Sequence, residues 1–247
     1  MSDQFSRTRL LVGDEPLARL SAAKVAVFGV GGVGGFCVEA LARAGIGTLH
    51  LYDDDTVSES NLNRQIVALH STLGQPKAEV MAQRVRDINP ACQVEAIRMF
   101  YLPENADQVD FTLYDYVVDC IDTVAAKLDL VERCTTLQVP ILSAMGSGNK
   151  LDPTAFRVTD LSKTQGCPLA RVMRKELRKR GITHLKVVYS TEEPLTPRQS
   201  AEEEPPAGTD TRPRSTARRS TPGSISFVPA AAGLVVASAV IRELGGF

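Results

Sequence analysis

The sequence predicts an α/β protein whose core is a doubly wound, mainly parallel sheet. The first observation is that short apolar segments alternate with segments of helical periodicity, the pattern of a parallel sheet covered by helices. The second is a glycine-rich turn between the first apolar segment and the first helical one. The third is size, because 247 residues with 43% hydrophobic content suit one large domain.

The first of these units runs from residue 24 to residue 55. An apolar segment at 25–28 breaks into GVGGVGG, a helical pattern follows at 36–44, and an apolar segment at 49–52 ends in three aspartates. Glycines let backbone N–H groups approach a phosphate, and the helix N-terminus favours its negative charge. A carboxylate after the second strand accepts hydrogen bonds from ribose hydroxyls. The unit therefore predicts a Rossmann-like nucleotide site formed by Gly29, Gly31, Gly32, Gly34 and either Asp53 or Asp55.

Strands and helices continue to alternate up to residue 144. Helical spacing predicts helices at 77–88 and 124–137, and apolar runs predict strands at 94–97, 116–121 and 140–144. Beyond Gly146 we expect strands at 156–158 and 185–189, a basic helix at 168–180 and an apolar helix at 229–244. We therefore expect a single domain over 1–247. It would comprise a nucleotide-binding core at 24–150 and a small C-terminal sheet and helix extension at 151–247.

Three other segments have distinctive compositions. Residues 1–23 predict an extended arm that leads into a short helix at 15–20. Residues 191–223 are rich in Pro, Ser, Thr, Glu and Arg with almost no large apolar side chain, so we expect a flexible insert. The candidate membrane segment at 225–241 contains Pro229 and Gly233 and is barely long enough to span, which favours a buried core helix and no membrane insertion.

The overall composition limits the possible functions. A net charge of -1 does not indicate general nucleic-acid binding, so such a role would need a local basic patch. The five cysteines form no CxxC pair, which argues against a disulfide framework or a cysteine zinc site and favours a reducing compartment. The polar N-terminus lacks an apolar signal core. We expect a cytoplasmic protein.

Several polar residues follow the expected strands, at the edge where open sheets bind ligands. Arg64 and Lys77 offer positive charge for phosphates, and Asn61 and Gln65 offer directional hydrogen bonds beside them. Asp122 directly follows a buried strand and is the best Mg²⁺ ligand in the chain.

Each of these residues also has a simpler interpretation. Lys77 at the start of a helix is compatible with a solvated surface lysine, and Asp122 with a cap for the helix near residue 124. Asn61 and Asn63 are compatible with turn positions. Capping and metal binding by Asp122 do not exclude each other.

Four motifs together resemble a known family: GVGGVGG, YDDDTVSESNLNRQ, GQPKAE and DCIDTVAAK, in that order over roughly residues 5–150. They resemble the ubiquitin-activating-enzyme-like adenylation superfamily, which includes activators of sulfur-carrier proteins. RTRLLVG, INPACQV, VTDLSKTQGCPLA and GSISFVPAAAG are similar to its tRNA threonylcarbamoyladenosine dehydratase branch.

The resemblance implies an ATP-dependent enzyme that uses Mg²⁺ and acts on tRNA carrying threonylcarbamoyladenosine. The carboxylate of that group would be adenylated, and ring closure would then expel AMP. The implied catalytic residues are Arg64, Lys77, Asp122 and Arg7. The resemblance also implies a homodimer in which an arginine of the N-terminal arm reaches the triphosphate of the partner subunit. Spacing to Gly13 favours Arg7, with Arg9 as a rival.

Two other functions remain open. The first is an activator that adenylates a ubiquitin-fold sulfur-carrier protein; the absence of CxxC pairs weighs against it. The second is an NAD-dependent oxidoreductase, which would have no need of the phosphate-directed charges of Arg64 and Lys77. Cys167, at a helix start where a thiol pKa can fall, would matter for the carrier activator, but the dehydratase route needs no nucleophilic cysteine.

The helix expected at 168–180 contains six cations within ten residues. The dipole of a helix favours cations in its last turn, but six cations are more than this effect explains. This local patch therefore predicts a contact with an RNA backbone. A second group, Arg212, Arg214, Arg218 and Arg219, lies in the expected insert close to Glu202, Glu203 and Glu204.

Overall fold

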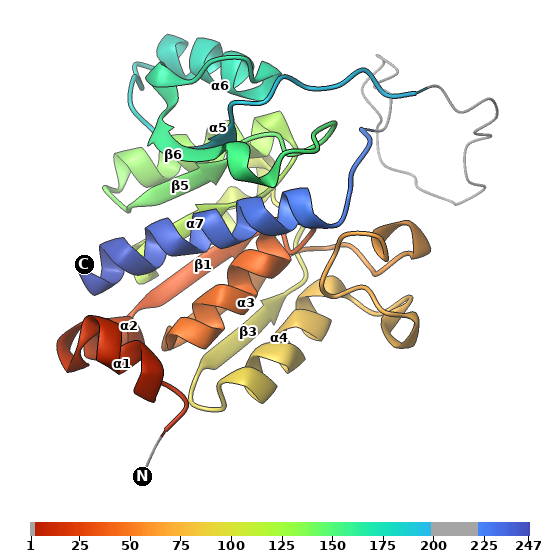
Figure 1. Ribbon diagram of the computed structural model, residues 1–247. Helices are drawn as coiled ribbons and strands as arrows, with labels where there is room; N and C mark the ends of the chain where they lie inside the picture. The colour runs from red at the N-terminus through yellow and green to blue at the C-terminus, as the bar shows by residue number, and fades with distance from the viewer. Residues whose placement is uncertain (1–2, 199–221) are drawn as a thin grey trace.

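The computed structural model describes residues 3–198 and 222–247, and its centre is a seven-stranded sheet (Figure 1). The strand order is β3-β2-β1-β4-β5-β7-β6. Every neighbouring pair is parallel except β6 with β7, which is antiparallel. The predicted doubly wound, mainly parallel sheet is confirmed. The two late strands extend this same sheet at one edge. The strands are β1 Lys24–Phe28, β2 Thr48–Tyr52, β3 Gln93–Ile97, β4 Tyr116–Asp119, β5 Ile141–Ala144, β6 Phe156–Asp160 and β7 Lys186–Ser190.

Helices cover both faces of the sheet. The α-helices are α1 Ser6–Val12, α2 Asp14–Ala22, α3 Gly34–Ala44, α4 Lys77–Ile88, α5 Val124–Thr136, α6 Pro168–Lys179 and α7 Phe227–Gly245. Short 3-10 helices are η1 Glu59–Asn61, η2 His70–Thr72, η3 Pro103–Gln108, η4 Phe111–Leu113, η5 Pro153–Ala155 and η6 Leu161–Lys163. Successive residues of β1 point to opposite faces, as strand geometry requires. Val25 and Val27 join the cluster under α3, α4 and α7, whereas Ala26 and Phe28 join the cluster under α5.

The chain changes direction between β1 and β4. From β1 it winds outward through β2 to β3, and it then returns to β4 and continues through β5 on the other side. Open parallel sheets bind ligands in the crevice beyond the carboxyl ends of their strands at such a switch point. The loops after β1 and β4 almost touch there, because a Cβ added to Gly29 would lie 2.8 Å from the carbonyl oxygen of Cys120.

The C-terminal helix α7 is long and apolar enough to cross a membrane by length and composition. In the structure it lies across the sheet beside α3, and Val228, Val236 and Val240 belong to the main core (Figure 1). Gly233 allows the two helices to approach closely, because a Cβ there would lie 2.2 Å from the carbonyl oxygen of Val33. The prediction of a buried core helix agrees with this packing.

Two expectations need correction. The N-terminal segment is not extended: it forms α1 and α2, joined at Gly13 with φ +83°. Sequence periodicity could not reveal α1, because α1 buries none of its residues, whereas α2 is held by hydrogen bonds from Arg19 to the carbonyl of Gly245. The predicted flexible insert begins with a docked stem, because Glu192 accepts hydrogen bonds from the N–H groups of 151 and 152. Its central part, 199–221, lies outside the described residues.

Candidate nucleotide-binding site

A cleft of 480 Å³ opens at the carboxyl ends of β1, β2, β4 and β5. One wall comes from the glycine loop with Asp53 and Asp55, and the floor includes Cys120 and Asp122. The opposite wall comes from residues 144–148 and 222–224. The sheet thus gathers in one place side chains that are separated by more than a hundred residues in sequence.

The carboxylate of Asp53 holds the glycine loop in place. The amide N–H of Val30 donates to Oδ2 of Asp53 at 2.7 Å, and the N–H of Asp55 donates to Oδ1 of the same carboxylate at 2.9 Å. Burial raises the pKa of Asp53, and these two donors partly offset that effect. The amides of Gly31 and Gly32, which line the cleft, donate to no other described residue. The loop therefore presents free N–H groups at the start of α3, an arrangement suited to a phosphate.

Gly34 has a structural role beneath this loop. A Cβ at Gly34 would lie 1.8 Å from the carbonyl oxygen of Gly29, which leaves no room for a side chain. Of the four predicted glycines, Gly29, Gly31 and Gly32 line the cleft, whereas Gly34 permits the tight turn.

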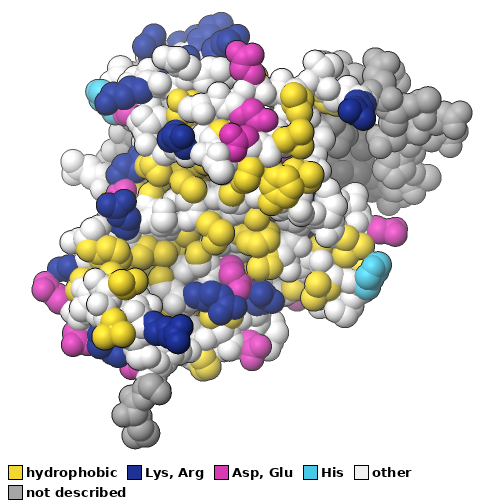
Figure 2. All heavy atoms as spheres, in the orientation of Figure 1, with side chains coloured by type: hydrophobic (Ala, Val, Ile, Leu, Met, Phe, Trp, Pro, Cys, Tyr) yellow, Lys and Arg dark blue, Asp and Glu magenta, His cyan; other side chains and the backbone are white. Residues whose placement is uncertain are grey.

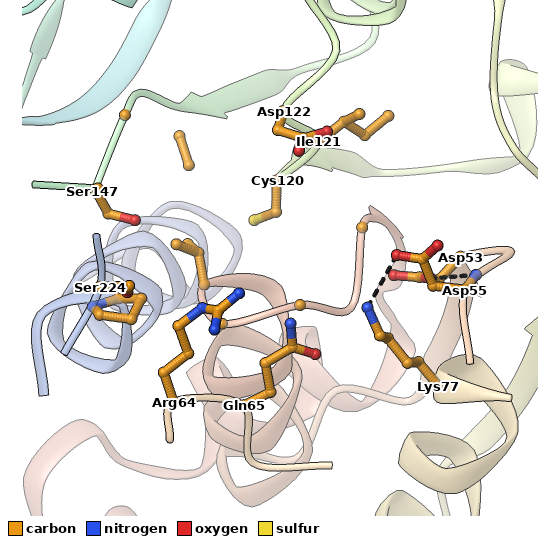
Figure 3. Close-up of a pocket in the computed structure, with 18 of the residues that line it drawn as sticks. Asp53, Asp55, Arg64, Gln65, Lys77, Cys120, Ile121, Asp122, Ser147 and Ser224 are labelled. Carbon is orange, nitrogen blue, oxygen red and sulfur yellow. Dashed lines mark hydrogen bonds and ion pairs between the residues drawn. The ribbon is translucent and has the colours of Figure 1, made fainter. Parts of the chain in front are cut away.

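Lys77 is the first residue of α4 and is buried, with its ammonium 2.9 Å from Oδ2 of Asp55 (Figure 3). Its backbone N–H also donates to the carbonyl of Asp55 at 3.0 Å. The alternative of a solvated surface lysine is therefore wrong. Both Asp53 and Asp55 line the cleft, Asp53 with a carboxylate that accepts two backbone N–H groups and Asp55 with one that pairs with Lys77.

Side chains of the NLNRQ segment line two neighbouring cavities. Arg64 and Gln65 reach the main cleft (Figure 3), and Oε1 of Gln65 is buried without a hydrogen-bond partner among the described residues. A buried amide oxygen of this kind suggests a missing ligand. Nη1 of Arg64 donates to the carbonyl of Ser60 at 2.8 Å, which holds the guanidinium in position. Asn61 instead lines a smaller adjoining cavity and accepts from the N–H of Ser58, so it has the turn role that was the alternative.

Asp122 is exposed at the floor of the cleft (Figure 3). Helix α5 is capped at Thr123, and the Asp122 carboxylate accepts no hydrogen bond from a described helix N–H. The capping interpretation is therefore wrong, and the carboxylate points into the cleft. A group of three potential protein ligands for a metal ion is absent from the described residues, so a cation here would depend on one protein carboxylate together with ligand oxygens and water.

Sequence reasoning missed a buried ion pair behind Asp122. Nζ of Lys127 lies 2.9 Å from Oδ2 of Asp119, and both side chains are 0% exposed. Lys127 also donates to the carbonyl of Ile121 at 2.9 Å, and the hydroxyl of Ser143 donates to Asp119. These bonds fix the peptide that precedes Asp122. The DCIDTVAAK motif contained both charges, but the sequence does not show that they point inward.

Sequence reasoning also missed the wall opposite the glycine loop. Ser147 follows the end of β5, and Ser224 comes from the far side of the insert; both line the cleft (Figure 3). Asn149 joins the two segments, because its Oδ1 accepts from the N–H of Gly223 and its own N–H donates to the carbonyl of Gly223. The Gly-Ser-Gly turn after the fifth strand was a signal for Ser147. Ser224 stands in the GSISFVPAAAG motif, but that motif did not indicate a position at the cleft.

The two N-terminal arginines differ in their surroundings. Arg9 makes ion pairs with Asp3 at 3.0 Å and Asp14 at 2.6 Å within its own chain. Arg7 is exposed and pairs with no described acidic residue, and neither arginine lines the cleft. This difference makes Arg7 the better candidate for contacts outside its own subunit.

The two cysteines nearest the chemistry differ in exposure: Cys120 is partly exposed at the cleft and Cys167 is buried. Burial raises the pKa of Cys120 to about 12, and the nearby carboxylate of Asp119 adds to that shift. Cys167 precedes α6 as predicted, but only 4% of it is exposed, and it packs in the cluster between α5 and α6.

The family model described as ThiF matches residues 5–247, which is nearly the whole chain. The chain belongs to the ThiF family. Within that family, this ThiF protein is 45% identical over 246 residues to the tRNA threonylcarbamoyladenosine dehydratase of Bacillus subtilis (strain 168), covering 99% of this chain and 95% of the relative. It is 36% identical to the protein of the same name from Escherichia coli (strain K12), covering 98% and 93%.

The structural comparison points the same way. This ThiF protein superposes on the E. coli tRNA N6-threonylcarbamoyladenosine dehydratase TcdA in complex with ATP with a TM-score of 0.84 and 35% identity. The match covers 98% of this chain and 94% of that one. A structure of the same E. coli protein in complex with AMP gives a TM-score of 0.85.

Proposed function

We propose that this protein is an ATP-dependent tRNA threonylcarbamoyladenosine dehydratase. The observation that carries the proposal is the cleft at the switch point, where a glycine loop, two cations and an exposed carboxylate converge. Relatives that align over 95% and 93% of their own length bear this activity in their names, and one of them has been solved with ATP. The nucleotide is ATP and not a dinucleotide.

The chemistry of adenylation fits the donor set of the cleft. A triphosphate needs positive charge and hydrogen-bond donors, and here the free amides of Gly31 and Gly32 line the same cleft as the guanidinium of Arg64. The orphaned amide of Gln65 supplies a further polar contact for the nucleotide. Asp53 or Asp55 binds the ribose, and Lys77, held against Asp55, supplies a second positive charge.

Magnesium fits the remaining carboxylate. Mg²⁺ in nucleotide sites is bound through one or two carboxylates together with phosphate oxygens and water, so the single side chain of Asp122 is sufficient on the protein side. When bound, the ion neutralises phosphate charge. The Lys127–Asp119 pair behind Asp122 keeps this carboxylate at the floor of the cleft.

The proposed reaction has two steps. A carboxylate oxygen of the threonylcarbamoyl group attacks the α-phosphorus of ATP, and pyrophosphate leaves. A nitrogen of the neighbouring ureido group next attacks the acyl carbon, a proton is lost, and AMP leaves with one of the original carboxylate oxygens. Because attacking and accepting groups belong to the same nucleoside, ring closure benefits from high effective concentration. The protein's task is to position and electrostatically stabilise the reacting groups.

The decisive experiment incubates the protein with ATP, Mg²⁺ and tRNA carrying threonylcarbamoyladenosine, followed by mass spectrometry of the nucleosides. We expect loss of one water from the modified nucleoside together with equal amounts of AMP and pyrophosphate. Heavy oxygen introduced into the substrate carboxylate should appear in the released AMP. Absence of nucleoside conversion, with AMP formed on a ubiquitin-fold sulfur carrier instead, would favour the carrier-activator function.

Two substitutions test the site itself. Asp122→Ala and Lys77→Ala should retain the fold but lose AMP formation, since both side chains serve the nucleotide. Calorimetry should show Mg²⁺-dependent binding of ATP and negligible binding of NAD to the unaltered protein. Tight NAD binding without an ATP signal would reject adenylation.

We further propose a homodimer in which Arg7 reaches the triphosphate bound by the partner subunit. Support comes from the exposure of Arg7 and from Leu10 and Leu11 beside it on α1, which are 86% and 87% exposed. A partner subunit would cover these apolar side chains. Mixing Arg7→Ala and Asp122→Ala subunits should restore part of the activity, because a hybrid dimer has one intact composite site. No rescue after demonstrated subunit exchange would mean that each site lies within one chain.

A further inference from the structure

Helix α6 has five cations and its C-cap residue Arg180 adds a sixth, and the structure separates the six into two groups. The first group is engaged within the protein. Arg174 donates from Nη1 to the carbonyl of Thr164 at 2.9 Å and to its hydroxyl at 2.6 Å, which fastens the turn after η6. Lys179 lies 2.8 Å from Glu176, and Arg180 lies 3.3 Å from Glu132. These three charges have structural partners.

The second group consists of Arg171, Lys175 and Arg178, which we call the basic stripe. All three are exposed, and none forms an ion pair with an acidic side chain in the described parts of the chain. Their spacing of four and three residues places them along one side of the helix, over about 10 Å at the usual helical rise. Figure 2 shows Lys and Arg side chains gathered at the top of the molecule, where α6 lies in Figure 1.

The position of α6 connects this stripe with the cleft. Leu169, in the first turn of α6, lines the cleft, and a Cβ added to Gly146 would lie 3.9 Å from the Cβ of Leu169. The helix therefore starts at the wall of the cleft and extends away from it, with the basic stripe beginning two residues after Leu169. A large substrate whose reacting group enters the cleft must cover the surface around this opening.

We infer that the basic stripe binds the phosphate backbone of the RNA whose modified nucleoside enters the cleft. This inference rests on the proposed function, since that function supplies the RNA. The protein as a whole has a net charge of -1, so a general electrostatic field does not explain attraction of a polyanion. Three exposed cations without an ion pair among the described residues, on a helix that starts at the wall of the cleft, provide the local attraction that is otherwise missing. Arg174, in contrast, is engaged with Thr164 through Nη1, so the basic stripe does not include it.

The test compares the full-length protein with the triple variant Arg171→Gln, Lys175→Gln, Arg178→Gln. Each phosphate contact that is removed should reduce the steepness of the plot of log affinity against log salt concentration by about one. The slope of the triple variant should therefore be less steep than that of the wild type by about three. The KM for tRNA should rise while kcat at saturating tRNA and the affinity for ATP stay unchanged. Replacing both arginines by lysine should preserve the slope.

Arg86→Glu is the control for a general change of net charge: it lowers the net charge by two units, against three in the triple variant, at an exposed helical cation near the end of α4. It should leave the tRNA affinity nearly unchanged. Unaltered tRNA affinity and salt slope in the triple variant, with normal conversion by the wild type, would overturn the basic stripe alone. Failure of the wild type to bind tRNA at all would overturn both the basic stripe and the proposed function.

Discussion

Replacing Lys127 by methionine should destabilise the protein strongly, because it leaves the charge of Asp119 buried without its partner. The two side chains are 2.9 Å apart and 0% exposed. Removing one member of such a pair costs about 3–5 kcal/mol, since the remaining ion keeps its desolvation penalty. Domains of ordinary stability have about 5–15 kcal/mol in total. The variant should therefore unfold at a much lower urea concentration.

A double variant separates the charge effect from the loss of packing. Lys127→Met combined with Asp119→Asn removes the buried charge while an amide oxygen still accepts from the N–H of Ile121, as Oδ1 of Asp119 does at 3.2 Å. This double variant should recover most of the lost free energy of unfolding. Lys179→Met serves as the control, because its ion pair with Glu176 is exposed and should contribute less than about 1 kcal/mol.

Urea unfolding followed by circular dichroism measures all three variants, provided that refolding is reversible. If the single variant does not accumulate in folded form, the double variant still tests the reasoning. A cost below about 1 kcal/mol for Lys127→Met, or a double variant no more stable than the single one, would refute the buried-charge argument. Because Lys127 also holds the carbonyl of Ile121, the single variant should in addition bind Mg-ATP more weakly.

Three further predictions concern the loop and the cysteines. Gly34→Ala should lower the free energy of unfolding by about 1–3 kcal/mol and weaken ATP binding, because its Cβ would collide with the carbonyl oxygen of Gly29. Gly146→Ala is the control and should leave stability nearly unchanged, because the nearest atom would lie 3.9 Å from its Cβ. Equal stability of the two variants in urea would contradict this steric argument. Cys120 should resist iodoacetamide at pH 8, because a pKa of about 12 leaves only about one thiol in ten thousand ionised, and rapid labelling in a peptide map would contradict the raised pKa. Its labelling should accelerate as the pH approaches that pKa, since only the thiolate reacts. Cys167→Ser should retain most of the nucleoside dehydration rate, and release of pyrophosphate without product would favour the carrier activator.

Local sequence patterns were sufficient for the central βαβ unit and for most of the candidate site. Strand β1, the glycine loop and α3 are close in sequence, and their periodicity and backbone requirements are local properties. Arg64, Lys77 and Asp122 were identifiable because each stands at a fixed place relative to a strand or helix end, and the carboxyl ends of parallel strands meet at one edge of the sheet.

Only the tertiary structure shows which polar side chains form hydrogen bonds or ion pairs within the protein and which do not. The sequence shows six similar cations at 171–180, but Arg174 is distinguished from Arg171 by its contact with Thr164, a residue outside α6. The pairing of Lys127 with Asp119 and the presence of Ser147 and Ser224 in one wall of the cleft depend in the same way on how separate segments pack. Helix α1 escaped notice because it buries no side chain and so leaves no hydrophobic period in the sequence. Periodicity reports which face of a segment is buried, whereas the partner of a charge is set by segments that the chain brings together only on folding.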